Sequence, residues 1–115
     1  MYKTLLLACL SGVVAGASIL SAYASDADTG KTIYFRTCLV CHGSDGTGDM
    51  PGVSDLTKKG AGLYQDDSIL LSRMQNGYQS TDSSMAMPPR GGDPALTESD
   101  LKEVLKFMRK KFQVP

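Results

Sequence analysis

The sequence predicts an all-α fold with about three main helices and long loops between them. Apolar residues in segment 97–112 recur at the spacing of one helix face, the clearest periodic pattern in the chain. Segments 43–65 and 77–96 are rich in glycine, proline, serine and aspartate, which is typical of loops. No segment after residue 24 has the alternating pattern of a strand. With 115 residues, the chain has room for one domain.

The N-terminal residues 1–24 have the pattern of a secretory signal peptide, so we expect the functional domain to be 25–115. Lys3 supplies the positive start, and an uncharged apolar run follows from Leu5 to Leu20. Ala22-Tyr23-Ala24 resembles a cleavage site, after which the sequence becomes polar. A retained membrane anchor is the alternative, because the uncharged run is long enough to span a bilayer.

Residues 26–41 are predicted to form the first helix. Gly30, Tyr34 and Cys38 recur at every fourth position and therefore share one face of it. A glycine within a helix lowers its stability, so we expect a packing reason for Gly30. The preferred interpretation is that another helix crosses closely at Gly30, with Tyr34 packed beside the crossing. The alternative is that Gly30 lies near a frayed helix start.

The end of this helix reads Cys38-Leu39-Val40-Cys41-His42, the C-x-x-C-H pattern of covalent c-type haem attachment. The two thiols would bond to the haem vinyl groups, and His42 would bind the iron. This histidine is the only one in the chain, which excludes bis-histidine ligation. Two cysteines and one histidine after residue 24 are also too few for a structural zinc site. The third cysteine, Cys9, lies in the apolar N-terminal run, where lipidation is a further alternative.

Residues 43–65 are predicted to be a loop that passes on the histidine side of the haem. We expect a backbone carbonyl near Pro51–Ser54 to accept a hydrogen bond from the imidazole and so fix its tautomer. The aspartates of this loop do not have the spacing of an EF-hand calcium site, and no glutamate closes the pattern. We therefore interpret them as solvated turn residues: Asp45, Asp49 and Asp55.

Two further helices are predicted after this loop. Residues 66–76 begin with Asp66-Asp67, whose negative charge suits the positive end of a helix dipole. Residues 97–112 begin at Thr97, which with Asp100 resembles a capping box. The apolar face of this last helix is expected to be buried and consists of Leu101, Val104, Leu105, Met108 and Phe112.

The loop 77–96 supplies the second iron ligand in our interpretation, because a methionine thioether is a known partner of an axial histidine. Met87 is favoured because Pro88-Pro89 follows it, which extends and stiffens the backbone. Met85 is the alternative; it lacks that restraint but would point the same way along an extended chain. The other methionines after residue 24 are expected in the core or on the histidine side: Met74, Met108 and Met50.

The chain combines segment 30–43, the Met87-Pro88-Pro89 loop and Phe107 on the last helix. In this combination it resembles the small bacterial class I cytochromes c over essentially all of the mature chain. In that family a glycine and an aromatic residue before the motif meet an aromatic residue of the last helix, and Gly30, Tyr34 and Phe107 match those places. The resemblance implies the class I cytochrome c fold around one covalent haem c, held by Cys38, Cys41, His42 and Met87.

The expected function is therefore electron transfer in the periplasm, with one haem iron cycling between Fe(II) and Fe(III) and with transient protein redox partners. The alternatives are a haem-bearing subunit of a larger redox enzyme and a haem ligand binder or sensor with an open site. A membrane-anchored protein facing the periplasm is the alternative location. Four basic residues are candidates for the rim of the haem edge or are ordinary solvated charges: Lys58, Lys59, Arg73 and Arg90.

Several function classes are not expected. The chain should not be an enzyme in its own right, because a single histidine leaves no spare distal base for a peroxidase. A thioredoxin-like role would need a βαβ pattern around the cysteines, which the sequence lacks. A formal net charge of +0 gives no basis for binding nucleic acid. Stable membrane insertion is not expected once the signal is cleaved.

Overall fold

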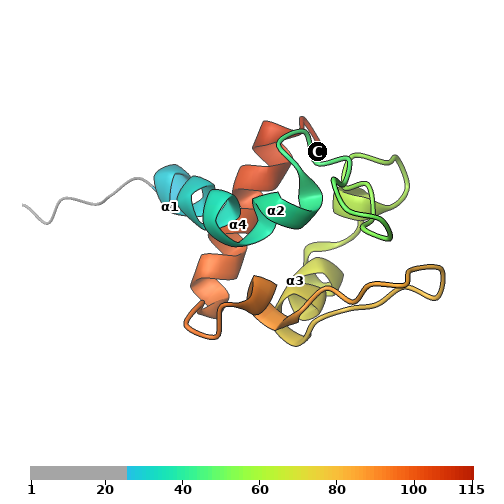
Figure 1. The fold of residues 1–115 in the computed structure, drawn as a ribbon. Helices are drawn as coiled ribbons and strands as arrows, with labels where there is room; N and C mark the ends of the chain where they lie inside the picture. The colour runs from blue at the N-terminus through green and yellow to red at the C-terminus, as the bar shows by residue number, and fades with distance from the viewer. Residues whose placement is uncertain (1–25) are drawn as a thin grey trace, which may run out of the picture.

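The computed structural model describes residues 26–115, so the predicted signal peptide and its Cys9 lie outside the described residues. The helices are α1 (Asp26–Ile33), α2 (Leu39–His42), α3 (Asp67–Asn76) and α4 (Glu98–Lys111). Figure 1 shows a helical fold in which α1 crosses α4, and α3 lies below α2 in this view. Shorter helical turns cover Tyr34–Cys38, Gly62–Tyr64 and Pro89–Gly92. Within 26–115 there is no strand, and the all-α prediction is confirmed.

The segment predicted as one helix over 26–41 is helical to His42 but changes form in the middle. Tyr34–Cys38 is a π-helical turn, in which the backbone N–H of Leu39 donates to the Tyr34 carbonyl. The Thr37 hydroxyl donates to the Ile33 carbonyl over 2.7 Å and so satisfies an acceptor at this irregular turn. A π-turn inserts one extra residue into a helix, so Cys41 and His42 are rotated relative to α1. Hydrophobic periodicity predicts only the regular form.

Gly30 is the point at which α1 packs closely on α4, as the sequence predicted. A Cβ atom at this position would lie 2.8 Å from the carbonyl carbon of Glu103 and 2.9 Å from the Cβ of Phe107. Tyr34 packs beside the crossing, is 0% exposed and has its ring centroid 5.7 Å from that of Phe107. The Tyr34 hydroxyl donates to the Gly43 carbonyl over 2.6 Å, which ties this crossing to the end of α2.

The capping box predicted for α4 is present. The Asp100 N–H donates to Thr97 Oγ1 over 3.2 Å, and the Thr97 N–H donates to Asp100 Oδ2 over 2.7 Å. The predicted apolar face is buried except at Phe112, which follows the end of the helix and is only partly buried. The main core also includes residues outside the helix faces predicted from periodicity: Ile33, Leu63, Leu96 and Val114. None of the helices within 26–115 has the length and apolarity needed to cross a membrane.

Candidate cofactor site

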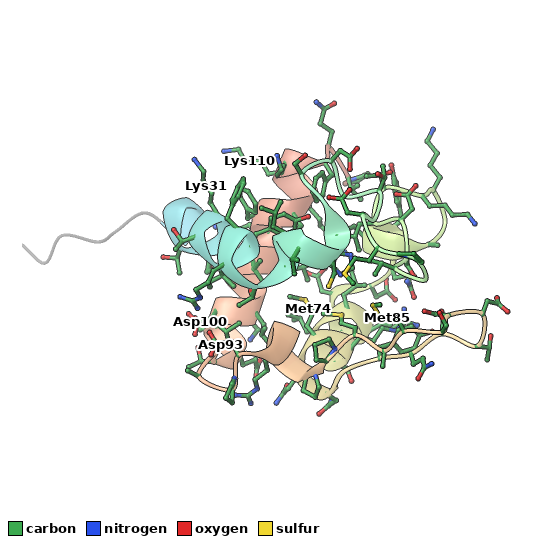
Figure 2. The ribbon with its side chains drawn as sticks, viewed as in Figure 1. Lys31, Met74, Met85, Asp93, Asp100 and Lys110 are labelled. Atoms are coloured by element: carbon green, nitrogen blue, oxygen red, sulfur yellow. The ribbon has the colours of Figure 1, made fainter. Side chains whose placement is uncertain are left out.

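A cavity of about 660 Å³ opens between the helical segment that ends at His42 and the loops and helix that follow it. This volume lies in the range of about 300–1,000 Å³ that is usual for small-molecule and cofactor sites. Its lining includes Cys38, Cys41 and His42 on one side and Met85 and Met87 from the later loop. Figure 2 shows yellow sulfur atoms gathered between α2 and the segment that carries Met85. The structure therefore brings every predicted site residue to one cavity.

The inner wall of this cavity is apolar and comes from the core. Its large apolar side chains come from α3, α4 and the turn before α3: Leu63, Leu70, Met74, Leu105 and Met108. The predictions that Met74 and Met108 are core residues are confirmed, and both also line the cavity. Figure 2 labels Met74 on the α3 side, across from the motif helix. Apolar walls of this kind suit a large flat ring and exclude water from its centre.

Cys38 and Cys41 lie half-buried along one side of the cavity, and both thiols are free. The π-turn ends at Cys38, so the two thiols are presented from a segment that is anchored to α4 through Tyr34 and Gly30. Burial raises the pKa of the Cys38 thiol. The Thr37 hydroxyl oxygen, 3.5 Å from the Cys38 sulfur, has the opposite effect and lowers that pKa. Both thiols lie in the wall of the cavity, where thioether bonds to haem would form.

The His42 imidazole is half-buried, and its Nδ1 atom is buried without a hydrogen-bond partner. Burial lowers the pKa of His42, and the backbone of Ser54 acts in the opposite direction. The window Pro51–Ser54, predicted to supply a carbonyl to this ring, thus lies beside it. A neutral imidazole binds metal through one nitrogen while the other interacts with a backbone or side-chain partner. The chemistry of His42 therefore fits an iron ligand.

Residues 43–61, which we call the histidine-side loop, are fixed to α2 at their start. The Gly48 N–H donates to the His42 carbonyl over 3.1 Å, and the Asp49 N–H donates to the Cys41 carbonyl over 2.9 Å. Asp45 and Asp55 each accept hydrogen bonds from the threonine two residues later, as turn-forming side chains do. The interpretation of these aspartates as turn residues is consistent with the absence of a metal-binding acidic cluster within 26–115.

Met87 reaches the cavity from a long hairpin, residues 78–87, whose base is closed by backbone hydrogen bonds. The Tyr78 N–H donates to the Met87 carbonyl over 3.1 Å, and the Met87 N–H donates to the Tyr78 carbonyl over 2.8 Å. Pro88 follows in an extended conformation, with φ −70° and ψ 152°. The two prolines after Met87 predicted that its backbone would be extended and stiff. The pairing of Met87 with Tyr78 was not predicted, because the segment between these two residues has no periodic pattern.

Met85 also lines the cavity and is half-buried, so the structure brings both candidate methionines to the site. Its backbone N–H donates to the Ser83 hydroxyl over 3.1 Å. Met85 therefore lies on the arm of the hairpin, whereas Met87 lies at the paired base. The difference favours Met87 as the residue whose backbone position is better fixed.

Two of the four basic residues singled out from the sequence line the cavity, namely Lys58 and Arg73. The guanidinium carbon of Arg73 lies 3.9 Å from the ring centroid of Tyr78, and Arg73 forms no ion pair with any carboxylate in 26–115. Arg90 instead donates to the Leu96 carbonyl over 2.7 Å. Cations beside an apolar cavity fit a ring that also carries carboxylates, as haem does through its propionates.

Comparisons with known proteins agree with this geometry. The profile of the Cytochrome c family matches residues 27–111. The chain is 30% identical over 102 residues to cytochrome c-555 of Chlorobaculum tepidum, which covers 86% of this chain and 92% of that protein. It is 28% identical over 83 residues to cytochrome c-555 of Chlorobaculum thiosulfatiphilum, covering 72% and 93%. The corresponding protein of Prosthecochloris aestuarii is 28% identical over 85 residues, covering 72% and 85%. No solved structure matches the chain at comparable significance.

Proposed function

This chain belongs to the cytochrome c family, carries covalently attached haem c and transfers electrons, and on that premise we propose that it is a periplasmic electron carrier with a closed iron site. The observation that supports this proposal is the single cavity in which two thiols, one imidazole and a methionine thioether meet. In the proposed site Cys38 and Cys41 would form the thioether bonds to haem, and His42 and Met87 would be the two iron ligands. Met85 is the alternative to Met87 as the second iron ligand.

The residues of the site suit an electron carrier because they hold one ligand set through both oxidation states. Haem supplies an iron that cycles between Fe(II) and Fe(III). His42 is fixed by the segment that carries both thiols, and Met87 is fixed by its backbone pair with Tyr78. Both residues would therefore hold the iron from backbone segments that the fold already fixes. The thioether ligand and the apolar wall both favour the reduced, less charged iron and so raise the reduction potential.

The periplasmic location and the domain boundary at residue 24 are supported by sequence alone. The apolar run and the Ala22-Tyr23-Ala24 pattern have the form of a cleaved export signal. Export also suits the two free thiols of the motif, because covalent haem attachment removes them from disulfide formation in an oxidising compartment. We propose transient protein redox partners and no catalytic role, because the only histidine of the chain is used as an iron ligand.

The absorption spectrum of the oxidised holoprotein tests the closed site. A methionine-to-iron charge-transfer band is expected, together with slow uptake of cyanide by the oxidised protein and of carbon monoxide by the reduced protein. Both follow from a sixth position that Met87 occupies. Absence of the band with immediate ligand uptake would overturn the carrier and favour an open-site ligand binder. Mass spectrometry of the exported protein tests the boundary, since cleavage after Ala24 leaves Ser25 as the first residue.

A further inference from the structure

A hydrogen bond at the cavity joins the histidine-side loop to the hairpin that carries the candidate methionine ligands. The Ser83 hydroxyl, on hairpin 78–87, donates to the Gly52 carbonyl of the histidine-side loop over 2.5 Å. Among the hydrogen bonds of the residues described by the structure, no other links these two segments. Figure 1 shows both segments extending beyond the helices on the same side of the molecule. Their relative position therefore depends strongly on Ser83.

Ser83 is also fixed within its own hairpin. Its hydroxyl oxygen accepts from the Met85 N–H over 3.1 Å, and two carbonyl oxygens lie within reach of its hydrogen, that of Gly52 at 2.5 Å and that of Met85 at 2.8 Å. A serine hydroxyl has one hydrogen and two lone pairs, so it donates to one carbonyl at a time, and the shorter contact assigns the hydrogen to Gly52 while the oxygen accepts from Met85. The Gln79 side-chain amide further donates to the Ser83 carbonyl over 2.9 Å. One side chain thus sets the shape of the hairpin near Met85 and its distance from the opposite loop.

Gly52 is suited to this contact by its lack of a side chain. Its φ is +84°, in the left-handed region, and a Cβ atom would lie 3.2 Å from the Ser83 hydroxyl and 3.1 Å from that of Ser84. Two residues later comes Ser54, whose backbone lies beside the His42 imidazole. The contact therefore connects the loop that borders the histidine ligand with the hairpin that carries the methionine ligand.

We propose that Ser83 is a positioning residue that latches hairpin 78–87 to the histidine-side loop and thereby keeps the Met87 thioether on the iron. The inference rests on the proposed function, in which Met87 is the second axial ligand. The pair with Tyr78 fixes the base of the hairpin, and Ser83 fixes the arm beyond it. Loss of the latch leaves that arm held only by bonds within the hairpin. The sixth position then opens more often to an external ligand.

Imidazole titration of the oxidised holoprotein tests the latch, because imidazole reaches the iron only when the thioether leaves it. Ser83→Ala should bind imidazole about threefold to tenfold more tightly than the wild type, the factor expected for loss of one net hydrogen bond. Ser83→Thr keeps the hydroxyl and should restore wild-type affinity. Ser84→Ala is the matched control, since Ser84 is the exposed neighbour, and it should leave the affinity unchanged.

A lower melting temperature of Ser83→Ala with imidazole affinity within about twofold of wild type would overturn the latch, because a purely structural role predicts that result. Gly52→Ala crowds the same contact from the other loop and should also tighten imidazole binding. This second variant tests the latch if Ser83→Ala does not fold. A wild-type protein without the methionine charge-transfer band would refute the ligand set and the latch together. A wild-type band with unchanged affinity in Ser83→Ala refutes the latch alone.

Discussion

The two candidate methionine ligands lie two residues apart, and the structure distinguishes them by backbone restraint rather than by side-chain type. Met87 forms a reciprocal pair of backbone hydrogen bonds with Tyr78 and precedes Pro88. Met85 forms no such backbone pair among the described residues. A thioether is flexible, so the position of its own backbone decides how much ordering entropy ligation costs. The restrained residue loses less freedom when it binds iron, and this is the physical basis for assigning Met87.

The ligand assignment predicts opposite results for two alanine variants. Met87→Ala should abolish the methionine-to-iron charge-transfer band and lower the reduction potential, because the iron loses its thioether. Met85→Ala should retain the band and the potential close to the wild type. Absorption spectroscopy and a redox titration of both holoproteins measure these effects. A band that survives in Met87→Ala but disappears in Met85→Ala would reverse the assignment.

Tyr34 carries a buried hydrogen bond that stabilises the segment before the haem motif. Its hydroxyl donates to the Gly43 carbonyl over 2.6 Å, and burial raises its pKa. Tyr34→Phe removes the donor and leaves that carbonyl unsatisfied, which should lower the free energy of unfolding by about 1–3 kcal/mol. Denaturant unfolding of the holoprotein measures the loss. Tyr64→Phe, at an exposed tyrosine, is the control and should change the free energy by less than about 0.5 kcal/mol.

The residue scale also shows what could be predicted from sequence. Cys38, Cys41 and His42 lie within five consecutive residues, so one local motif predicts all three. Met87 was predicted because the proline after it restricts its backbone locally. Tyr78 and Ser83 act through partners elsewhere in the chain, and neither has a distinctive neighbour in the sequence. The role of Ser83 depends on how two loops meet in space, and that of Tyr78 on how the two ends of one hairpin pair, and no local pattern encodes either.

At the level of elements, the crossing of α1 and α4 depends on the absence of a side chain at Gly30. Alanine normally stabilises a helix interior relative to glycine by about 1 kcal/mol. Here a Cβ would lie 2.8 Å from the Glu103 carbonyl carbon, and overpacking typically costs about 1–3 kcal/mol. Gly30→Ala should therefore lower the melting temperature of the holoprotein. Thr32→Ala, at an exposed position of α1, is the control and should leave it unchanged or raise it.

A rise in melting temperature for Gly30→Ala would show that the helices separate easily and that the close crossing contributes little. The crossing itself was predicted correctly, because Gly30 and Tyr34 share a helix face and Phe107 matched a family position. The π-turn was not predicted. Its stability depends on tertiary packing of Tyr34 and on the Thr37 side-chain bond, whereas helix periodicity assumes regular backbone bonding.

The capping box of α4 makes part of the stability dependent on pH. Hydrogen bonds from Thr97 lower the pKa of Asp100. A carboxyl with a lowered pKa stabilises the fold above its ordinary pKa of about 3.9, and this contribution is lost as the pH falls through the lower folded value. Asp100→Asn should therefore melt below the wild type at pH 7, and the difference should shrink below about pH 4.

Thermal unfolding of the holoprotein at several pH values measures this difference. Asp66→Asn is the control for loss of a negative charge at a helix start, because Asp66 precedes α3 but its side chain makes no capping bond. Its effect should be smaller than that of Asp100→Asn at pH 7. A gap between wild type and Asp100→Asn that stays constant from pH 7 to pH 3 would contradict the assignment of the effect to the carboxylate.

At the scale of the whole molecule, the cofactor cavity is continuous with the hydrophobic core. Leu63, Leu70, Met74, Leu105 and Met108 belong to that core and also line the cavity. Tyr34, another core residue, packs where α1 crosses α4. A domain this small buries little apolar surface on its own, so a haem bound in this cavity would complete the core as well as carry the electron. The same residues would then serve the redox centre and the stability of the fold.

This arrangement predicts that the chain does not keep its fold without the attached haem. Cys38→Ala/Cys41→Ala removes both thioether bonds and leaves a cavity of about 660 Å³ between the helices. Total stability of a small domain is about 5–15 kcal/mol, which loss of the haem contacts of five core residues would largely remove. Circular dichroism should show reduced helix content and no cooperative melting transition in haem-free protein. Cys38→Ala alone, with one thioether left, should still melt cooperatively but at a lower temperature than the wild-type holoprotein. Cooperative melting of the haem-free double variant at the holoprotein temperature would mean that α1 and α4 form a sufficient core by themselves.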